Sequence, residues 1–360
     1  MIITAKVKLL PSPEQTVLLR EVMERVNAAC NWISGEAWEH KTFGQYHLHH
    51  LVYYPTREQF ALPSKLTVRA IAKVADAYKL DKKTCRTFRK DGAIDYENGC
   101  LRWWIDRGEV SLLTLAGREC IPFVCGPRQA ELLLHRQGQS SLATADGKFY
   151  LIACCNVDTP DPQDVSDFLG VDLGIVNIAT DSDGTVYSGA QVNALRRRHR
   201  RLRQKLQAKG TTSARRLLKE RRRKESRFAA DVNHCISKEI VATAKDTGRG
   251  IAVEDLKHIR DRVTVRKPQR STLSSWAFAQ LRSFITYKAA LAGVPVVAVD
   301  PRNTSRTCPA CGLVDKRNRK SQASFKCVGC GFSAPADLNA ARCIAGRAAT
   351  DQPYAAGACA

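Results

Sequence analysis

The chain of 360 residues lacks several features that define whole classes of protein. It has no apolar run of about 18 residues, so no segment is suited to cross a membrane as a helix. Polar side chains follow Met1 too closely for a secretory signal peptide. Its fourteen cysteines are scattered, unlike the regular framework of a secreted disulfide-linked domain. These absences predict a protein of the reducing cytoplasm without a membrane partner.

Acidic residues are also few compared with basic ones. The 57 Lys and Arg exceed the 35 Asp and Glu, which gives a formal net charge of +22. Such a protein binds polyanions and loses affinity as salt rises, so nucleic acid is the leading partner. The length suffices for two or three domains, and a hydrophobic content of 44% supports packed cores.

Four cysteines form two closely spaced pairs separated by fifteen residues: Cys308 with Cys311, and Cys327 with Cys330. This spacing is typical of a tetrahedral zinc site. Gly312 and Gly331 each follow the second cysteine of a pair, where the backbone must turn toward the thiolates. The pattern predicts a structural Zn²⁺ ribbon. If the four cysteines instead formed two disulfides, or were unpaired and buried, this spacing would be a coincidence.

The N-terminal half combines strand and helix patterns. Residues 2–10 alternate with the period of a strand, and a helix is predicted from the start signal at residues 11–14 through Trp38. A second helix is predicted over 64–80. Short strands are predicted over residues 100–105, 110–115, 121–124, 130–134 and 149–156. With the first strand they indicate a small β-barrel, which a proline-rich linker near 159–162 separates from a new domain.

Basic side chains on the predicted 64–80 helix have two interpretations. Lys65, Arg69 and Lys73 lie apart from the apolar face of that helix. A solvated helix face explains them without any ligand, whereas contact with nucleic acid is the functional alternative. The helix by itself does not decide between the two.

Three acids lie on predicted strands or at the start of a predicted helix in the C-terminal half. Asp172 lies within an apolar strand that leads into a hairpin, Glu254 ends another apolar strand, and Asp337 lies in the first turn of a helix. A carboxylate between apolar neighbours is costly unless a cation compensates it, although an edge-strand Asp172 facing water is the structural alternative. Together the three acids predict ligands for two Mg²⁺ (or Mn²⁺) ions in phosphodiester hydrolysis.

An arginine-rich segment separates the first two acids. Residues 191–230 contain sixteen Lys and Arg and almost no acids, and a break at 209–212 predicts a helical hairpin. Because the charges share one sign, we expect the hairpin to bind the phosphate backbone of an A-form or hybrid duplex. The expected contacts are Arg196, Arg197, Arg198, Arg200, Arg201, Arg203, Arg221, Arg222 and Arg223.

The order of these motifs resembles that of the TnpB (OrfB-type) proteins of bacterial insertion sequences, relatives of the compact type V CRISPR effectors. The matching segments are Gly170–Gly174, the arginine-rich hairpin, Ile251–Leu256, Thr304-Ser305 before the cysteines, and Asp337–Ala341. The resemblance implies a multidomain α/β plus β fold. A RuvC-like nuclease domain of the RNase H fold would carry the catalytic Asp172, Glu254 and Asp337, with the zinc ribbon inserted before Asp337.

The resemblance also implies a domain organisation. An N-terminal β-barrel wedge domain is interrupted by a helical recognition domain, and a linker leads to the nuclease domain. The expected boundaries are 1–10 and 96–158 for the wedge, 11–95 for the recognition domain, 159–167 for the linker, 168–300 and 332–345 for the nuclease domain with its hairpin at 191–245, 301–331 for the ribbon, and 346–360 for a flexible tail.

Members of the family use an RNA from the transposon end to guide cleavage of double-stranded DNA beside a short transposon-adjacent motif. The resemblance therefore implies an endodeoxyribonuclease whose partners are a guide RNA and double-stranded target DNA, and a monomer is expected. One departure lies before Asp337, where the family often has another acid and an arginine but this chain has Pro335-Ala336. Two alternatives stay open. They are a nuclease-inactive RNA-guided DNA-binding repressor, against which the intact acids argue, and a DNA transposase, which the same fold also serves.

Overall fold

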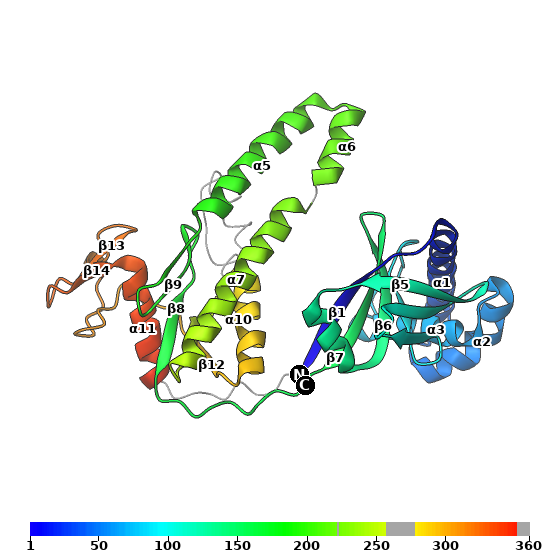
Figure 1. Ribbon diagram of the computed structural model, residues 1–360, viewed down its shortest axis with the longest axis horizontal. Coiled ribbons are helices and arrows are strands. Elements are labelled where there is room, and N and C mark those ends of the chain that lie inside the picture. Colours follow the sequence, from blue (N-terminus) through cyan, green and yellow to red (C-terminus); the bar gives the residue numbers. More distant parts are fainter. Residues whose placement is uncertain (222, 257–277, 351–360) are drawn as a thin grey trace. The chain divides into compact units, whose positions relative to one another are not determined.

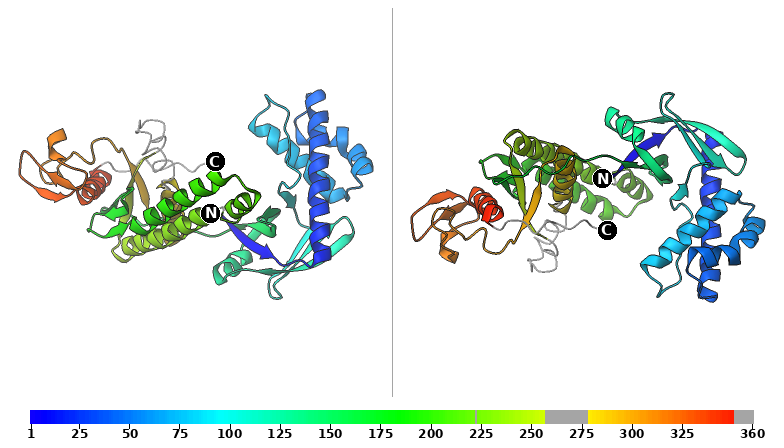
Figure 2. Two further views of the ribbon diagram at one scale, coloured as in Figure 1. Left: turned by 90° about the horizontal axis from the view of Figure 1, so that it is seen from above. Right: turned by 90° about the horizontal axis from the view of Figure 1, so that it is seen from below.

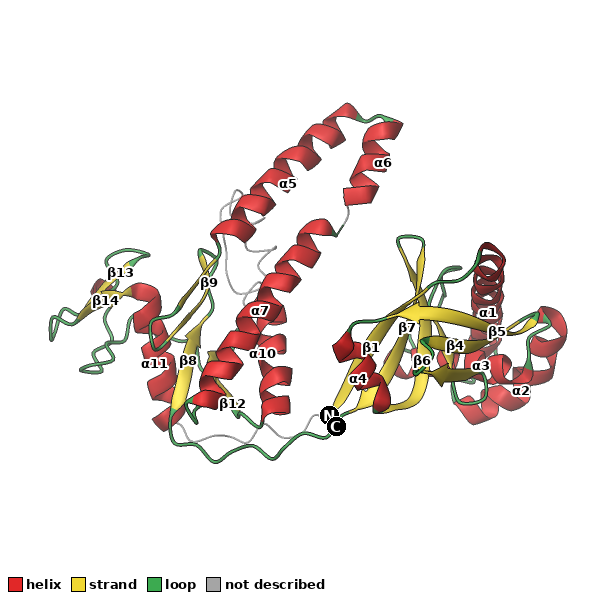
Figure 3. Ribbon diagram, viewed as in Figure 1, coloured by secondary structure: helices red, strands yellow, loops and turns green. Residues whose placement is uncertain are grey.

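The computed structural model describes residues 1–221, 223–256 and 278–350 of the chain (Figure 1). The chain forms two compact units, Met1–Asp158 and Thr159–Ala360, and each is treated by itself. Both units mix helices with strands (Figure 3). Within the described ranges, no helix combines the length and apolar character that a membrane crossing demands.

The first unit is built on a seven-stranded antiparallel sheet with the strand order β2-β6-β7-β1-β5-β4-β3. The strands are β1 (Ile2–Leu9), β2 (Ile94–Tyr96), β3 (Leu101–Trp104), β4 (Glu109–Thr114), β5 (Gly117–Val124), β6 (Arg136–Ala145) and β7 (Lys148–Asn156). β1 is the middle strand of this order, and it pairs with β7 on one side and with β5 on the other. The outermost strands, β2 and β3, are joined by only residues 97–100, so the sheet nearly closes on itself.

Four helices accompany this sheet: α1 (Pro13–Glu39), α2 (Gln45–Phe60), α3 (Ser64–Leu80) and α4 (Pro127–Leu134). Ser12 and Gln15 form the capping box that starts α1. The predicted strand at 130–134 is wrong, since these residues belong to α4. Gly126 and Pro127 start that helix, and a short apolar run does not distinguish strand from helix by periodicity. Helix α2 is not predicted from the sequence, because few of its residues are buried and its apolar pattern is weak.

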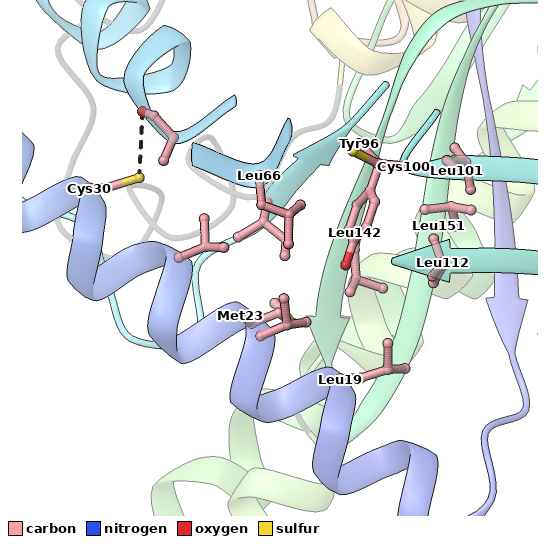
Figure 4. Close-up of a cluster of buried hydrophobic side chains, with 14 of the residues drawn as sticks. Leu19, Met23, Cys30, Leu66, Tyr96, Cys100, Leu101, Leu112, Leu142 and Leu151 are labelled. Atoms are coloured by element: carbon pink, nitrogen blue, oxygen red, sulfur yellow. Dashed lines mark hydrogen bonds between the residues drawn. The ribbon is translucent and has the colours of Figure 1, made fainter. Parts of the chain in front are cut away.

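The core of the first unit lies between the helices and the sheet (Figure 4). Leu19 and Met23 of α1 and Leu66 of α3 pack with Leu142 and Leu151 of the sheet. The hydroxyl group of the fully buried Tyr96 donates to the carbonyl of Leu113 at 3.0 Å, which satisfies the one polar atom of that side chain.

The second unit contains a five-stranded sheet with the order β10-β9-β8-β11-β12. The strands are β8 (Phe168–Asp172), β9 (Asn177–Asp181), β10 (Val186–Ser188), β11 (Gly250–Glu254) and β12 (Val296–Val299). β8, β11 and β12 run parallel to one another, whereas β9 pairs in antiparallel fashion with both β8 and β10. β8 therefore lies at the centre of the sheet, which excludes the edge-strand interpretation of Asp172.

Helices cover both faces of this sheet (Figures 1 and 2). Helix α11 (Ala336–Thr350) packs on one face, and α7 (Lys224–Asp246) and α10 (Phe278–Ala292) pack on the other. Gly170 permits the close approach of α11, because a Cβ atom there would lie 2.1 Å from the carbonyl oxygen of Ala341. The arrangement is a mixed α/β layer structure with an apolar core on each side of the sheet.

The arginine-rich segment forms a projecting arm of three helices, one more than the hairpin that the sequence predicts. α5 (Ala190–Lys209) ends at Gly210 in the left-handed conformation, α6 (Thr212–Arg221) follows, and α7 returns to the sheet. Near the C-terminus, β13 (Ser324–Lys326) and β14 (Ser333–Pro335) form a two-stranded sheet within the cysteine-rich segment.

Candidate active site

Two of the predicted acids lie at the same edge of the second sheet. The parallel register pairs Val171 of β8 with Val253 of β11, so the next residues, Asp172 and Glu254, lie side by side where both strands end. The carboxyl ends of adjacent parallel strands are a common place for a functional site in α/β folds. The sheet thus brings together two carboxylates that are 82 positions apart in sequence, 254 − 172.

Helix α11 adds the third acid. Asp337 lies in its first turn, and Oδ2 of Asp337 accepts a hydrogen bond from the Asn177 amide at 2.8 Å. All three carboxylates line one cavity of about 680 Å³. The structure therefore unites the three acids that the sequence singled out.

Burial raises the pKa of two of these carboxylates. The pKa of Asp172 is raised to about 7, first by burial and then by the charges of Glu254 and Asp337. Burial also raises the pKa of Glu254, although a hydrogen bond from the Thr304 hydroxyl at 2.5 Å opposes the effect. Like charges in a buried cavity are stabilised when cations enter it.

Carboxylate oxygens are the ligands that hard divalent cations prefer, so the residues present fit such a cation. Among the described residues, the group of three or more His, Cys, Asp or Glu donor atoms that lie within 4.8 Å of one another is that of the four cysteines, and the three acids do not form a second such group. Asp172, Glu254 and Asp337 would hold a divalent cation in the cavity that they share.

We expect Asp172→Asn to stabilise the metal-free protein at pH 8. The pKa of Asp172 is about 7 in the folded state, above its ordinary 3.8. The wild type therefore loses stability as pH rises from about 4 to about 7, and the amide escapes this loss. The gain should be at most about 4 kcal/mol, measured as a higher melting temperature of the zinc-loaded protein in buffer without added Mg²⁺ or Mn²⁺. Near pH 4 the two proteins should melt alike, and saturating Mg²⁺ should reverse their order by stabilising only the wild type.

Arg319 is a site residue that the sequence analysis missed. It comes from the cysteine-rich segment and lines the same cavity as the three acids. Of the residues in the described ranges, it is the one Lys or Arg in that lining. Its positive charge opposes the rise in the pKa of both Asp172 and Glu254. Nothing in the sequence distinguishes it from the other 56 basic residues, because only the fold carries it to the acids.

The four predicted zinc ligands converge in space. Sγ of Cys308 lies 3.6 Å from that of Cys330, and Sγ of Cys311 lies 3.6 Å from that of Cys327. Tetrahedral Zn–S bonds of about 2.3 Å place sulfurs about 3.8 Å apart, so the cluster fits a metal ion without rearrangement. Gly312 and Gly331 have φ angles of +74° and +75°, as the knuckle turns require. The thirteen described cysteines form no disulfide.

The arm displays many of the expected nucleic-acid contacts to solvent. The exposed arginines are Arg197, Arg198, Arg200, Arg201, Arg203 and Arg223. Arg196 and Arg221 are partly buried, Arg196 lies 3.8 Å from Glu225, and Arg222 falls outside the described residues. This surface has the charge and exposure that binding to a phosphate backbone requires.

The three basic residues of α3 differ in their surroundings. Nζ of Lys73 donates to Oδ1 of Asn27 at 2.8 Å and to the Ala93 carbonyl at 2.6 Å. Arg69 forms an ion pair with Glu97 and a hydrogen bond with Gln139. Lys65 is exposed. Lys73 and Arg69 therefore contribute to the packing of α3, and Lys65 is the best placed of the three to meet nucleic acid.

We expect Lys73→Ala to destabilise the protein and Lys65→Ala to leave its stability unchanged. Removing Lys73 leaves the buried Asn27 with an unsatisfied oxygen, which should lower the free energy of unfolding by about 1–2 kcal/mol in urea denaturation. If Lys65 contacts nucleic acid, Lys65→Ala should weaken DNA binding while its unfolding curve matches the wild type. Unchanged affinity and motif preference for Lys65→Ala would remove it from the predicted interface.

Comparison with known proteins links this chain to two described families. Residues 152–260 match OrfB_IS605, described as a probable transposase, and residues 278–344 match the Cas12f1-like TNB domain. The first match covers β8 to β11 with the arm, and the second covers α10, the cysteine-rich segment and Asp337. The two matched segments contain all three acids and all four cysteines.

Curated proteins of related names are similar to this chain. The chain is 36% identical over 199 residues to the CRISPR-associated endodeoxyribonuclease Cas12f1 of Sulfoacidibacillus thermotolerans, covering 51% of this chain and 46% of the relative. It is 32% identical to the TnpB-like protein MJ0751 of Methanocaldococcus jannaschii, covering 47% and 64%. It is 29% identical to the putative RNA-guided DNA endonuclease InsQ of Escherichia coli, covering 55% and 53%. The matches thus span between about half and two thirds of these relatives.

A solved structure shares the fold of nearly the whole chain. The protein of a Cas12f1–sgRNA–target DNA complex superposes with a TM-score of 0.64 at 15% identity, covering 93% of this chain and 83% of that one. The chain therefore shares the mixed α/β fold of that protein, and the match extends over the N-terminal unit as well as the C-terminal one.

Proposed function

The chain is a relative of the TnpB and Cas12f proteins, as its motifs indicated, and on this premise we propose that it is an RNA-guided endonuclease of double-stranded DNA. It would be encoded by a bacterial insertion sequence and cut beside a transposon-adjacent motif. The observation that carries the proposal is the single cavity formed by Asp172, Glu254 and Asp337 at the ends of two parallel strands. The residues that line that cavity fall within the two segments matched by the family models, and a relative of the chain is named as an endodeoxyribonuclease.

The proposed chemistry is metal-dependent phosphodiester hydrolysis in a RuvC-like domain of the RNase H fold. Two Mg²⁺ or Mn²⁺ ions, when bound, lower the pKa of the attacking water and neutralise the leaving oxygen. Asp172, Glu254 and Asp337 hold them at the rim of the sheet. Arg319 is placed to bind a non-bridging phosphate oxygen, since guanidinium groups form charge-assisted hydrogen bonds with phosphate.

The other parts of the chain receive roles from the same proposal. The cysteine cluster holds Zn²⁺ and fixes the segment that presents Arg319. The exposed arginines of the arm contact the guide RNA or its duplex with target DNA. The N-terminal sheet is assigned as the wedge domain and helices α1 to α3 as the recognition domain, with the boundaries expected from the sequence. Lys65 is the candidate contact to the adjacent-motif duplex.

Two other functions are less well supported. An RNA-guided repressor without nuclease activity has no use for three carboxylates in one cavity, where burial raises the pKa of Asp172 and of Glu254. A DNA transposase would use the same acids. The products of the reaction distinguish a transposase from a guided nuclease. Joined DNA ends identify a transposase, whereas free cut ends identify a nuclease.

The deciding experiment joins RNA identification with cleavage. The protein is expressed with its native flanking DNA, the co-purified RNA is sequenced, and that RNA is reprogrammed against a plasmid library in Mg²⁺. Cleavage of matched targets beside one short motif is the expected result. A defined RNA with binding but no cleavage favours the repressor, and the absence of a discrete RNA contradicts guided function.

A further inference from the structure

Asn177 makes a hydrogen bond to one of the candidate ligands although it is not itself one of the three acids. Its Nδ2 donates to Oδ2 of Asp337 at 2.8 Å, across 160 positions of sequence. An ionised carboxylate only accepts hydrogen bonds, so the amide nitrogen of Asn177 must face it. The contact therefore occupies Oδ2 and leaves Oδ1 of Asp337 for another partner.

The backbone that carries Asn177 is held on several sides. The Gly189 amide donates to the Val176 carbonyl at 2.9 Å, and the Asn193 side chain donates to the Ile175 carbonyl at 2.8 Å. A Cβ atom at Gly174 would lie 2.6 Å from the Asn177 carbonyl oxygen, so that turn is tightly folded. Asn177 is thus presented from a fixed segment between β8 and β9, which lines the same cavity as the acids.

Asp337 needs such a partner because of its place in α11. An aspartate in the first turn of a helix is attracted to the free backbone N–H groups there. Without a competing donor, its carboxylate would turn back toward the helix terminus and away from the cavity. Glu254 is held in a comparable way, since Oε1 of Glu254 accepts the Thr304 hydroxyl at 2.5 Å.

We propose that Asn177 is a positioning residue that orients Asp337 for a divalent cation. The inference rests on the proposed function, because it assumes that Asp337 is a metal ligand. Outer partners that orient metal ligands typically change metal affinity or activity by about 10–100-fold when they are removed. Asn177 then contributes to metal affinity without touching the metal.

The test measures Mn²⁺ binding to the full-length, zinc-loaded protein by electron paramagnetic resonance. Asn177→Ala is expected to raise the Kd for Mn²⁺ by at least about tenfold and to leave the melting temperature without added Mn²⁺ unchanged. Its DNA cleavage should recover as Mn²⁺ is raised. Asn193→Ala is the matched control, because it removes an asparagine hydrogen bond to the same segment without reaching a carboxylate.

Each other outcome counts against the inference. Wild-type Mn²⁺ affinity in Asn177→Ala, or an equal loss in both variants, would show that Asn177 only supports the segment. The Asp172→Ala variant gives the baseline of non-specific binding. A wild-type protein that binds no more Mn²⁺ than this baseline contradicts the proposed function itself, so the two failures are distinguishable.

Discussion

Replacing Asp172, Glu254 or Asp337 by alanine should lower the rate of DNA cleavage by at least about a thousandfold, which corresponds to about 4 kcal/mol of barrier. Each carboxylate is placed to hold a cation that stabilises charge at the reacting phosphate, and no other acid on the described residues lines the cavity except Asp255. Asp255 is paired with Arg282 at 2.6 Å and is therefore a poor substitute. Cleavage is measured on a matched plasmid under single-turnover conditions.

Binding provides the necessary contrast. The three variants should retain RNA and DNA affinity within a few-fold, because the arm and not the cavity carries the exposed arginines. Asp183→Asn is the matched control, since Asp183 belongs to the hairpin that follows Asp172 and pairs with Arg249 outside the cavity. Cutting near the wild-type rate in any of the three alanine variants would remove that acid from the site.

Replacing Cys308 or Cys330 by serine should release zinc and unfold the cysteine-rich segment. That segment has almost no apolar core of its own, because its buried cluster contains Phe325 and two of the ligand cysteines, with Phe332 packed against them. Metal binding must then supply most of its folding free energy, for which structural zinc contributes about 10 kcal/mol or more in isolated peptides. Zinc per protein, measured by elemental analysis, should fall from about one toward zero.

Loss of zinc should also impair cleavage, because the segment delivers Arg319 to the cavity of the three acids. Cys343→Ser is the matched control. Cys343 is buried beside the segment and its thiol donates to the Thr307 carbonyl at 3.2 Å, yet it lies outside the four-cysteine cluster. This variant should keep its zinc. A Cys308→Ser protein with full zinc content and activity would contradict the assignment of the cluster.

Much of the local structure followed from the sequence. The helix over 64–80 is confirmed as α3, and the strand ending at Glu254 is confirmed as β11. The strand predicted to contain Asp172 is β8, which ends at that residue. These elements have clear periodicity, caps or turn residues, which act over a few residues. The strand predicted at 130–134 and the unforeseen α2 show the limit, since short or weakly patterned segments take their conformation from what they pack against.

The sequence by itself determined the candidate residues: the three acids, and the four cysteines whose spacing is a local property of the chain. Only the tertiary structure decided what surrounds them. It placed Arg319 in the cavity, bonded Asn177 to Asp337 and Thr304 to Glu254, and engaged Lys73 within the first unit. Such contacts join positions that are 46 to 160 residues apart in the sequence. The type of a common residue does not show which distant residue it will contact. Burial has the same origin, so the raised pKa of Asp172 exists only in the folded chain, where its carboxylate is partly buried beside those of Glu254 and Asp337.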